Sequence, residues 1–212
     1  MAAPTVRVRI GFTPDTFTLD DLVRGILDTG KLGGATTLTD VTSDVQSVTI
    51  NRGRSRDLDS FFTGSCNVQL LNNARKYENT NTSSPYYPGI EPMIEIHVDA
   101  TTDGGSNYED LFVGFVTDIN LSYPDANNSF ANFQASDAFM KVANTELINA
   151  SFGSSASGTL IGNILDNANV KFGTNRNIET GVSTMQSLSG LSGNTLSVLQ
   201  TVEQSENGLL FM

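Results

Sequence analysis

The sequence has few of the side chains on which most enzyme and metal chemistry depends. Cys66 is its only cysteine and His97 its only histidine. A single cysteine excludes an intrachain disulfide, and no group of Cys and His residues has the spacing of a zinc site. No recognisable motif combines a nucleophile with a general base and a further residue that orients the base. We therefore expect a protein that is not an enzyme and that holds no cofactor or metal ion.

Cys66 and His97 each have an ordinary structural explanation. Cys66 is on the apolar face of a predicted strand, where a small buried hydrophobic side chain is the usual finding. His97 is at an outward position of another predicted strand, so a surface role is expected. Glu109 and Asp110 are adjacent and would point to opposite faces of a strand. A pair of carboxylates brought together by the fold, as in a glycosidase, is the remaining enzymatic alternative.

Long apolar runs and basic charge are also scarce. No apolar run approaches the length of a transmembrane helix, and the first residues lack the basic and apolar regions of a signal peptide. We expect a soluble protein made in a cytoplasm. The net charge is −11, with 9 basic and 8 acidic residues up to Lys76 and 3 basic and 15 acidic residues after it. Such a surface repels DNA phosphates, which argues against a DNA-binding module but fits a protein that DNA slides past.

Strands with alternating apolar and polar side chains dominate the sequence up to Asp137. The predicted strands cover residues 6–10, 45–50, 64–71, 93–98, 111–121 and 129–135. Alternation predicts one buried and one wet face for each strand. In the longest, the predicted buried side chains are Leu111, Val113, Phe115, Ile119 and Leu121. We expect residues 99–107 to form a polar turn, and the whole pattern predicts an antiparallel barrel or sandwich.

The pattern changes after Asp137. Residues 138–142 predict a short helix, and the Gly- and Ser-rich residues 151–158 predict a linker. Apolar residues then recur at helical spacing from Leu160 to Ala168. A last helix is predicted between Asn194, a good N-cap residue, and Gly208, a good residue to follow the C-terminus of a helix.

The predicted fold is mainly β, with two domains. Residues 1–147 are expected to form an antiparallel β-barrel domain with an insertion near residues 17–40. Residues 148–212 are expected to form a small α+β domain. Residues 209–212 look like the start of a further strand. This suggests that the chain is the front part of a longer protein; the alternative is that the strand pairs with one near Ile178.

Three arginines, Arg52, Arg54 and Arg56, follow the strand at residues 45–50 and have three interpretations. They form a solvated turn balanced by Asp57 and Asp59, a subunit interface, or a phosphate site. Guanidinium groups pair in bidentate fashion with carboxylates, which suits an interface. The acidic remainder of the chain makes phosphate binding the least favoured interpretation.

Tyr86 and Tyr87 lie between Pro85 and Pro88. Tyrosine serves both as a rigid element of a core and as an exposed contact, and the sequence does not separate the two uses. Together with Tyr123, these residues are also candidates for the aromatic groove of a carbohydrate-binding module.

Several segments resemble minor tail proteins of siphophage tail tips. The most specific are the Arg-Gly-Arg-Ser-Arg sequence at residues 52–56 and the Pro-Tyr-Tyr-Pro sequence at residues 85–88. The resemblance also covers residues 17–28, 41–59, 70–79, 81–87 and 196–210. It implies a role similar to the baseplate hub of contractile-tailed phages, in which a tail-tube-like β-barrel opens the chain. Such hubs are typically trimers that adapt a sixfold tube to a threefold tip.

The resemblance implies a set of partners and a location. The partners would be further copies of the chain in a ring, a tail tube or distal tail protein, and tip or receptor-binding proteins, all in the tail tip of the virion. DNA would pass through the ring without specific binding, so we expect the lumen to be acidic or neutral. The candidate interface residues are Arg52, Arg54, Arg56, Arg75, Tyr86 and Tyr87. The alternatives are a carbohydrate-binding β-module of a phage receptor-binding protein and a peptidoglycan hydrolase.

Overall fold

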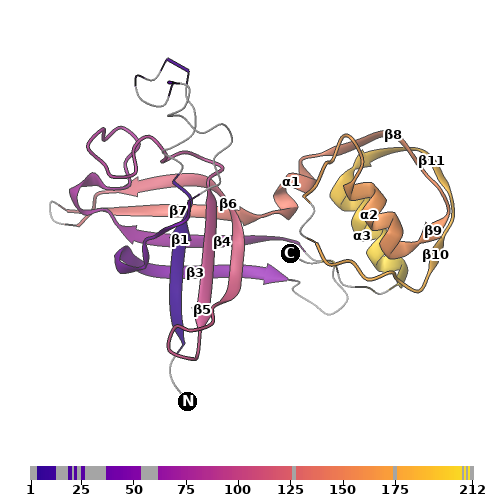
Figure 1. Cartoon of the computed structure of the whole chain (residues 1–212), viewed down its shortest axis with the longest axis horizontal. Coiled ribbons are helices and arrows are strands. Elements are labelled where there is room, and N and C mark those ends of the chain that lie inside the picture. Colours follow the sequence, from indigo (N-terminus) through magenta and orange to yellow (C-terminus); the bar gives the residue numbers. More distant parts are fainter. Residues whose placement is uncertain are drawn as a thin grey trace. The chain divides into compact units, whose positions relative to one another are not determined.

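A computed structural model gives the structure of the chain (Figure 1). It describes residues 4–12, 19–20, 22, 25–26, 37–53, 62–125, 128–173, 176–206, 208 and 210. The chain divides into two compact units: unit 1 comprises Met1–Asn51 and Ser65–Asp137, and unit 2 comprises Arg52–Gly64 and Ala138–Met212. Most of the insertion expected near residues 17–40 lies outside the described residues. The described elements confirm the mainly β class with a small α+β region.

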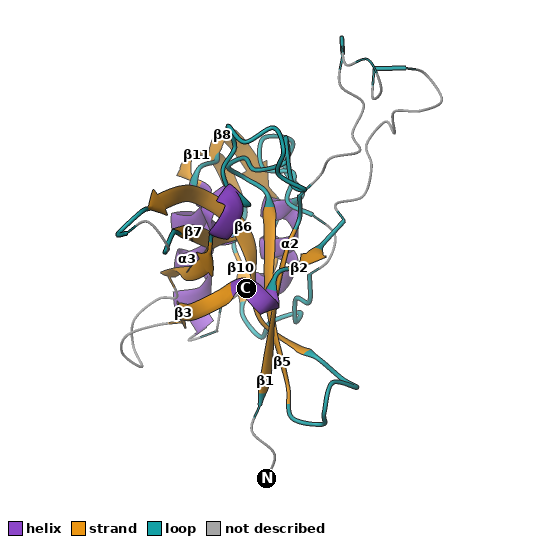
Figure 2. Cartoon of the chain, turned by 90° about the vertical axis from the view of Figure 1, so that its left-hand side faces the viewer, coloured by secondary structure: helices purple, strands orange, loops and turns teal. Residues whose placement is uncertain are grey.

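Unit 1 is built on a curled, antiparallel, seven-stranded sheet that forms a half-barrel. The strand order is β2-β1-β5-β6-β7-β4-β3. The strands are β1 Thr5–Ile10, β2 Thr39–Asp40, β3 Val45–Gly53, β4 Phe62–Leu71, β5 Glu95–Thr101, β6 Glu109–Ser122 and β7 Phe130–Asp137. Two single turns of 3-10 helix accompany them, η1 Thr42–Asp44 and η2 Asn73–Arg75. Figure 2 shows β1 and β5 side by side, in agreement with their antiparallel pairing.

Alternation along the strands produces the core of unit 1, as predicted for β4. Cys66, Val68 and Leu70 are buried on one face of that strand, while Ser65 and Asn67 are exposed on the other. Because side chains of a strand point alternately to opposite faces, one strand contributes both to the core and to the wet surface. Burial raises the pKa of the Cys66 thiol to about 12, so this side chain behaves as a small apolar group, as expected.

The predicted buried face of β6 is wrong in its first half. Phe112 and Val116 are buried, whereas Leu111 and Val113 are exposed. The register of β6 shifts twice, once against β5 between Val98 and Asp99 and once against β7 between Val116 and Asp118. Each bulge inserts one extra residue, and a shift of one residue moves every following side chain to the other face. Ile119 and Leu121, which follow the second bulge, do pack against the core as predicted.

Unit 2 contains three helices and two small two-stranded sheets among its described residues. Its elements are α1 Phe139–Ala143, β8 Glu146–Phe152, β9 Ser155–Ala156, α2 Ser157–Leu165, β10 Thr184–Met185, β11 Leu188–Asn194 and α3 Thr195–Glu206. β8 pairs with β11, and β9 pairs with β10. The core is formed by Leu160 and Ile164 of α2 together with Leu199 and Val202 of α3. Figure 1 shows α2 and α3 side by side, with the strands of the unit around them.

The helix predictions for unit 2 are confirmed, and the linker prediction is wrong. Asn194 accepts a hydrogen bond from the Ser197 N–H at 3.1 Å, which caps α3 as predicted. Residues 151–158, predicted as a linker, contribute to β8, β9 and the start of α2. The Ser157 hydroxyl donates to Glu206 at 2.6 Å, and a Cβ at Gly158 would collide with the Glu179 carbonyl oxygen. Small residues are therefore present here because the packing is tight.

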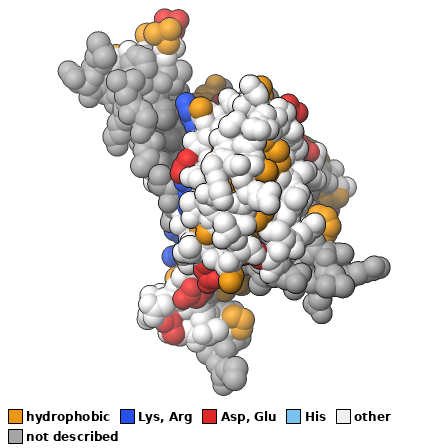
Figure 3. Space-filling model, turned by 90° about the vertical axis from the view of Figure 1, so that its right-hand side faces the viewer, with side chains coloured by type: hydrophobic (Ala, Val, Ile, Leu, Met, Phe, Trp, Pro, Cys, Tyr) orange, Lys and Arg blue, Asp and Glu red, His pale blue; other side chains and the backbone are white. Residues whose placement is uncertain are grey.

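On the face seen in Figure 3, uncharged groups outnumber acidic and basic side chains among the described residues. None of the helices in the described ranges is long and apolar enough to cross a membrane.

Candidate functional site

The arginines predicted to form an interface are described only in part. Arg54 and Arg56 lie outside the described residues, and Arg52 is exposed near the end of β3. Arg75 is exposed in η2 and pairs with Glu78, with 2.6 Å between Nη2 and Oε1. An interface role for these four residues stays a prediction.

The two tyrosines of the Pro-Tyr-Tyr-Pro sequence differ in their surroundings. Tyr86 is half-buried and stacks on Phe12 at 4.3 Å and on Tyr77 at 5.4 Å between ring centroids. Tyr87 is 42% exposed. The first ring therefore fastens the loop to the core of unit 1, and the second is available for contacts. Whether either residue contacts a partner stays a prediction.

A neutral polar surface covers β3, β4, β7 and part of β6 on the side of the sheet away from the core. The register places Ser65 opposite Ser136 and Asn67 opposite Gln134. A hollow on this surface is lined by Thr49, Asn51, Ser65, Cys66, Asn67, Thr117, Gln134, Ala135 and Ser136. We call its hydroxyl and amide side chains the neutral face: Thr49, Asn51, Ser65, Asn67, Thr117, Gln134 and Ser136. None of these described lining residues carries a charge, so the neutral face offers hydrogen bonds but no cation. The register places the exposed carboxylate of Asp118 opposite Gln134, at its border.

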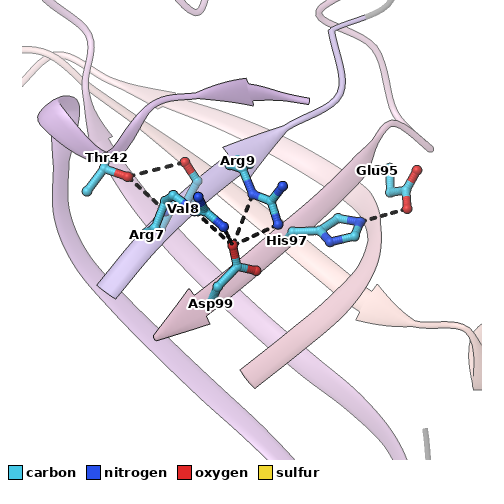
Figure 4. Close-up of polar contacts among 7 residues, drawn as sticks. All are labelled: Arg7, Val8, Arg9, Thr42, Glu95, His97 and Asp99. Atoms are coloured by element: carbon cyan, nitrogen blue, oxygen red, sulfur yellow. Dashed lines mark hydrogen bonds and ion pairs between the residues drawn. The ribbon is translucent and has the colours of Figure 1, made fainter. Parts of the chain in front are cut away.

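A charged cluster occupies the other end of the same polar side, on β1, β5 and β6 (Figure 4). Its members are Arg7, Arg9, Glu95, His97, Asp99 and Asp110. Both arginines converge on one oxygen of Asp99: Arg7 Nη2 and Arg9 Nη2 each lie 2.7 Å from Asp99 Oδ2. His97 Nε2 lies 2.7 Å from Glu95 Oε1. The guanidinium of Arg7 also stacks on Tyr108, 3.7 Å from the ring centroid.

Strand register explains how residues so far apart in the sequence meet in the charged cluster. Arg7 is paired with Asp99, and Arg9 with His97, in the antiparallel ladder of β1 and β5. Asp110 is paired with Asp99 across the bulge in β6. Without that bulge, Leu111 would occupy the place opposite Asp99, and Asp110 would point to the opposite face.

The polar turn predicted at residues 99–107 is wrong at its start. β5 continues to Thr101, and Asp99 is completely buried. Burial acts to raise the pKa of Asp99, but the hydrogen bonds from Arg7 and the charges of both arginines outweigh it and hold the pKa below its ordinary value. Burial and the neighbouring Asp99 carboxylate raise the pKa of Asp110.

A second group of polar contacts, the partly buried Asp44 network, joins η1 to the residues after η2. Tyr77 Oη donates to Asp44 Oδ2 at 2.6 Å, and Lys76 Nζ lies 2.6 Å from the same oxygen. Tyr77 is completely buried, and burial together with the bond to Asp44 raises its pKa. This network holds the connection between β4 and β5 against the core.

The fold of the chain recurs in a solved phage protein. The crystal structure of the 43 kDa tail protein of prophage MuSo2 from Shewanella oneidensis matches 96% of this chain and 49% of that protein, with a TM-score of 0.54 and 14% sequence identity. The chain has the fold of this phage tail protein. It spans about half of the length of that protein.

A second solved structure is similar to a smaller extent. It is the E. coli c3393 protein, a component of the type VI secretion system that exhibits structural similarity to the T4 bacteriophage tail proteins gp27 and gp5. The match covers 67% of this chain and 36% of the c3393 chain, with a TM-score of 0.44 and 8% sequence identity. No protein-family model matches the sequence, and neither does any curated protein.

The tail-protein fold thus carries two polar features in unit 1 that differ in charge. The neutral face lies over β3, β4 and β7, and the charged cluster lies over β1, β5 and the start of β6. The sequence predicts that each strand has a solvent-exposed face, but it predicts neither the neutral face nor the charged cluster. Both arise from pairing between strands that are distant in the chain.

Proposed function

We propose that the protein is a structural component of a bacteriophage tail tip, located in the virion. Copies of the chain would form a hub ring, with three copies as the expected number. The ring would join the tail tube to the tip and line the conduit through which DNA passes. The observation that carries this proposal is the neutral face, which lies on a sheet with a tail-protein fold.

The neutral face has the chemistry that a DNA conduit needs. Proteins that hold DNA do so mainly with Lys and Arg, which neutralise phosphates and release counterions. The hydroxyl and amide groups of Ser65, Asn67 and Gln134 offer no such charge. They keep a hydrated wall that offers phosphates no cation to bind, and the carboxylate of Asp118, opposite Gln134, repels them. DNA would therefore pass without specific binding.

The remaining surfaces would make the protein contacts of the ring. The candidates are Arg52, Arg54, Arg56, Arg75, Tyr86 and Tyr87. Of these, Tyr87 is exposed on a loop that Tyr86 fastens to the core. Arg75 is already paired with Glu78, so an intersubunit pair would have to exchange that partner. The neighbours would be a tail tube or distal tail protein on one side and tip or receptor-binding proteins on the other.

The test is an electron cryomicroscopy reconstruction of assembled tails, from which the symmetry and the position of the chain can be read. We expect a ring with the neutral face toward the lumen. A monomer outside the conduit, or a lumen lined by Lys and Arg, contradicts the proposal.

A matched pair of variants tests the role of the neutral face itself. Asn67→Lys with Gln134→Lys places two cations on the neutral face, and we expect tails that assemble but release DNA more slowly. Thr159→Lys, on an exposed position of α2, is the control and should leave DNA release unchanged. Normal DNA release from the double variant counts against the conduit.

A further inference from the structure

The charged cluster contains a buried oxygen that its neighbours leave unused. Asp99 Oδ2 accepts hydrogen bonds from Arg7 Nε at 3.0 Å, Arg7 Nη2 at 2.7 Å and Arg9 Nε at 3.0 Å. Within the described part of the chain, Asp99 Oδ1 has no hydrogen-bond partner, although the side chain is only 1% exposed. A buried carboxylate oxygen without a partner is destabilising, because it has lost its hydrogen bonds to water. This oxygen therefore calls for a cation or a donor.

Two further ligand atoms lie beside that buried carboxylate. His97, Asp99 and Asp110 each offer an atom, and these atoms lie within 4.8 Å of one another. The bulge in β6 is what brings Asp110 to this face, opposite Asp99. Bulges commonly re-aim a side chain at a functional position. Asp110 is exposed, so the group is open to solvent on one side.

The neighbours of these three residues match the surroundings of metal ligands. Glu95 Oε1 lies 2.7 Å from His97 Nε2. In the tautomer with the hydrogen on Nε2, Glu95 accepts that hydrogen and Nδ1 has a lone pair for a metal ion. A ligating histidine almost always donates its other N–H to a carboxylate or carbonyl in this way, and ligating carboxylates are hydrogen-bonded in turn. Arg7 and Arg9 orient Asp99 through Oδ2 (Figure 4). Oδ1 is the oxygen of that carboxylate that has no hydrogen-bond partner within the described residues.

The charge balance also permits a dication. The carboxylates of Glu95, Asp99 and Asp110 outnumber the guanidinium groups of Arg7 and Arg9 by one. The two arginines therefore do not give the cluster an excess of fixed positive charge. The two arginines weaken the pull of Asp99 on a metal ion, which indicates moderate rather than very tight affinity.

We infer that His97, Asp99 and Asp110 form a binding site for a divalent transition metal ion, with Zn²⁺ as the best match. One imidazole nitrogen and two carboxylate oxygens suit Zn²⁺, whereas Mg²⁺ and Ca²⁺ prefer oxygen ligands alone. Water would complete the coordination on the exposed side. The ion would link β5 to β6 across the bulge. The inference of a metal site does not depend on the proposed function in a phage tail.

Isothermal titration calorimetry of the full chain with ZnCl₂, MgCl₂ and CaCl₂ tests the inference. We expect one Zn²⁺ per chain, bound at least tenfold more tightly than Mg²⁺ or Ca²⁺. His97→Gln and Asp110→Asn should each weaken Zn²⁺ binding by at least about tenfold, the scale seen even when only a supporting residue of a metal site is lost. Asp118→Asn, an exposed carboxylate of β6 outside the cluster, should leave binding unchanged.

A spectroscopic measurement on the unaltered chain keeps the inference testable if a variant fails to fold. Co²⁺ in place of Zn²⁺ should give visible absorption bands typical of mixed nitrogen and oxygen ligands, and added Zn²⁺ should remove them. A chain that binds neither ion at millimolar concentration overturns the inference. Zn²⁺ binding of equal strength in folded His97→Gln and Asp110→Asn overturns it as well.

Discussion

The hydroxyl groups of two tyrosines, Tyr77 and Tyr123, each donate a hydrogen bond that involves the connection between β4 and β5. The Tyr77 hydroxyl is completely buried and donates to Asp44, while Tyr123 is 54% exposed and donates to Glu78 at 3.0 Å. The two contacts have the same chemistry, a phenol bonded to a carboxylate. They differ in whether water can replace the bond, and this difference sets their contribution to stability.

Tyr77→Phe should lower the free energy of unfolding by about 1–3 kcal/mol, because the Asp44 carboxylate loses a buried, charge-assisted hydrogen bond. Tyr123→Phe is the matched control and should change it by less than about 0.5 kcal/mol, since water replaces the hydroxyl at an exposed site. Urea denaturation followed by circular dichroism measures both. Equal effects of the two substitutions would contradict the assigned role of the Asp44 network.

Asp44 should also contribute to the pH dependence of stability. Burial acts to raise its pKa, but the hydrogen bonds from Lys76 and Tyr77 outweigh it, so the pKa of Asp44 is lower in the folded chain than in the unfolded one. Its contribution is therefore complete above the unfolded pKa of about 4 and is lost as the pH falls through the folded pKa.

Asp44→Asn tests this contribution. The variant should be less stable than the parent protein at pH 7, and the difference should narrow below about pH 4, where the parent carboxylate becomes protonated. Urea midpoints measured from pH 7 down to pH 2 provide the comparison. A difference that stays constant over this range would show that the charge of Asp44 is not what stabilises the fold.

Among the elements, β6 shows most clearly what alternation can and cannot predict. Strand β4 lies in a regular ladder, so its sequence alone assigns Cys66, Val68 and Leu70 to the core. In β6 apolar residues occupy both alternating sets of positions, so either face could be the buried one. Two bulges determine which of these residues are buried. The position of a bulge depends on the partner strands, so a single strand's sequence does not reveal it.

The charged cluster was hidden from sequence reasoning for a related reason. Arg7 and Asp99 are 92 positions apart, and the polar, glycine-containing composition of residues 99–107 predicts a turn that includes Asp99. One local signal was available. Arg7 and Arg9 alternate with the buried residues Val8 and Ile10, so two arginines had to share one face of a half-buried strand. Such a pair requires a carboxylate on the neighbouring strand.

Gly114 is the residue of β6 at which close packing leaves no room for a side chain. A Cβ there would meet the Ser136 carbonyl oxygen and lie 2.7 Å from the Phe112 ring. Gly114→Ala should therefore lower the free energy of unfolding by about 1–3 kcal/mol through overpacking.

Gly162→Ala is the matched control for that substitution. Gly162 lies in α2 with nothing within 4 Å of an added Cβ. Alanine favours a helix over glycine by about 0.5–1 kcal/mol, so this variant should be more stable than the parent protein. Thermal denaturation measures whether Gly114→Ala lowers and Gly162→Ala raises the stability. An unchanged stability of Gly114→Ala would contradict the close approach of β6 and β7.

For the whole molecule, the sequence predicted the class of fold better than the details of its organisation. The mainly β class and the likeness to phage tail proteins agree with the structure and with a solved tail protein. The division into domains at residues 147 and 148 stays a prediction about independent folding. The interface residues stay predictions too, because a contact between copies depends on a partner surface that no single chain contains.

Arg54→Glu tests the interface at the scale of the assembly. If Arg54 pairs with a carboxylate of a neighbouring subunit, reversal of its charge should reduce the yield of complete tails, as counted by electron microscopy and by infectivity. Lys171→Glu, an exposed charge reversal in unit 2, is the control. Normal infectious tails carrying Arg54→Glu would show that this arginine is only a solvated surface residue.

The outer position of β3 in the sheet has a consequence for how the protein behaves once purified. Among the described strands, β3 pairs with β4 alone, so no described strand covers the backbone donors and acceptors of its other edge. Residues 45–51 contain no charged residue and no proline, the usual deterrents of edge-to-edge aggregation. At high concentration the purified protein should therefore self-associate along this edge. Thr49→Lys should keep it monomeric, as measured by light scattering.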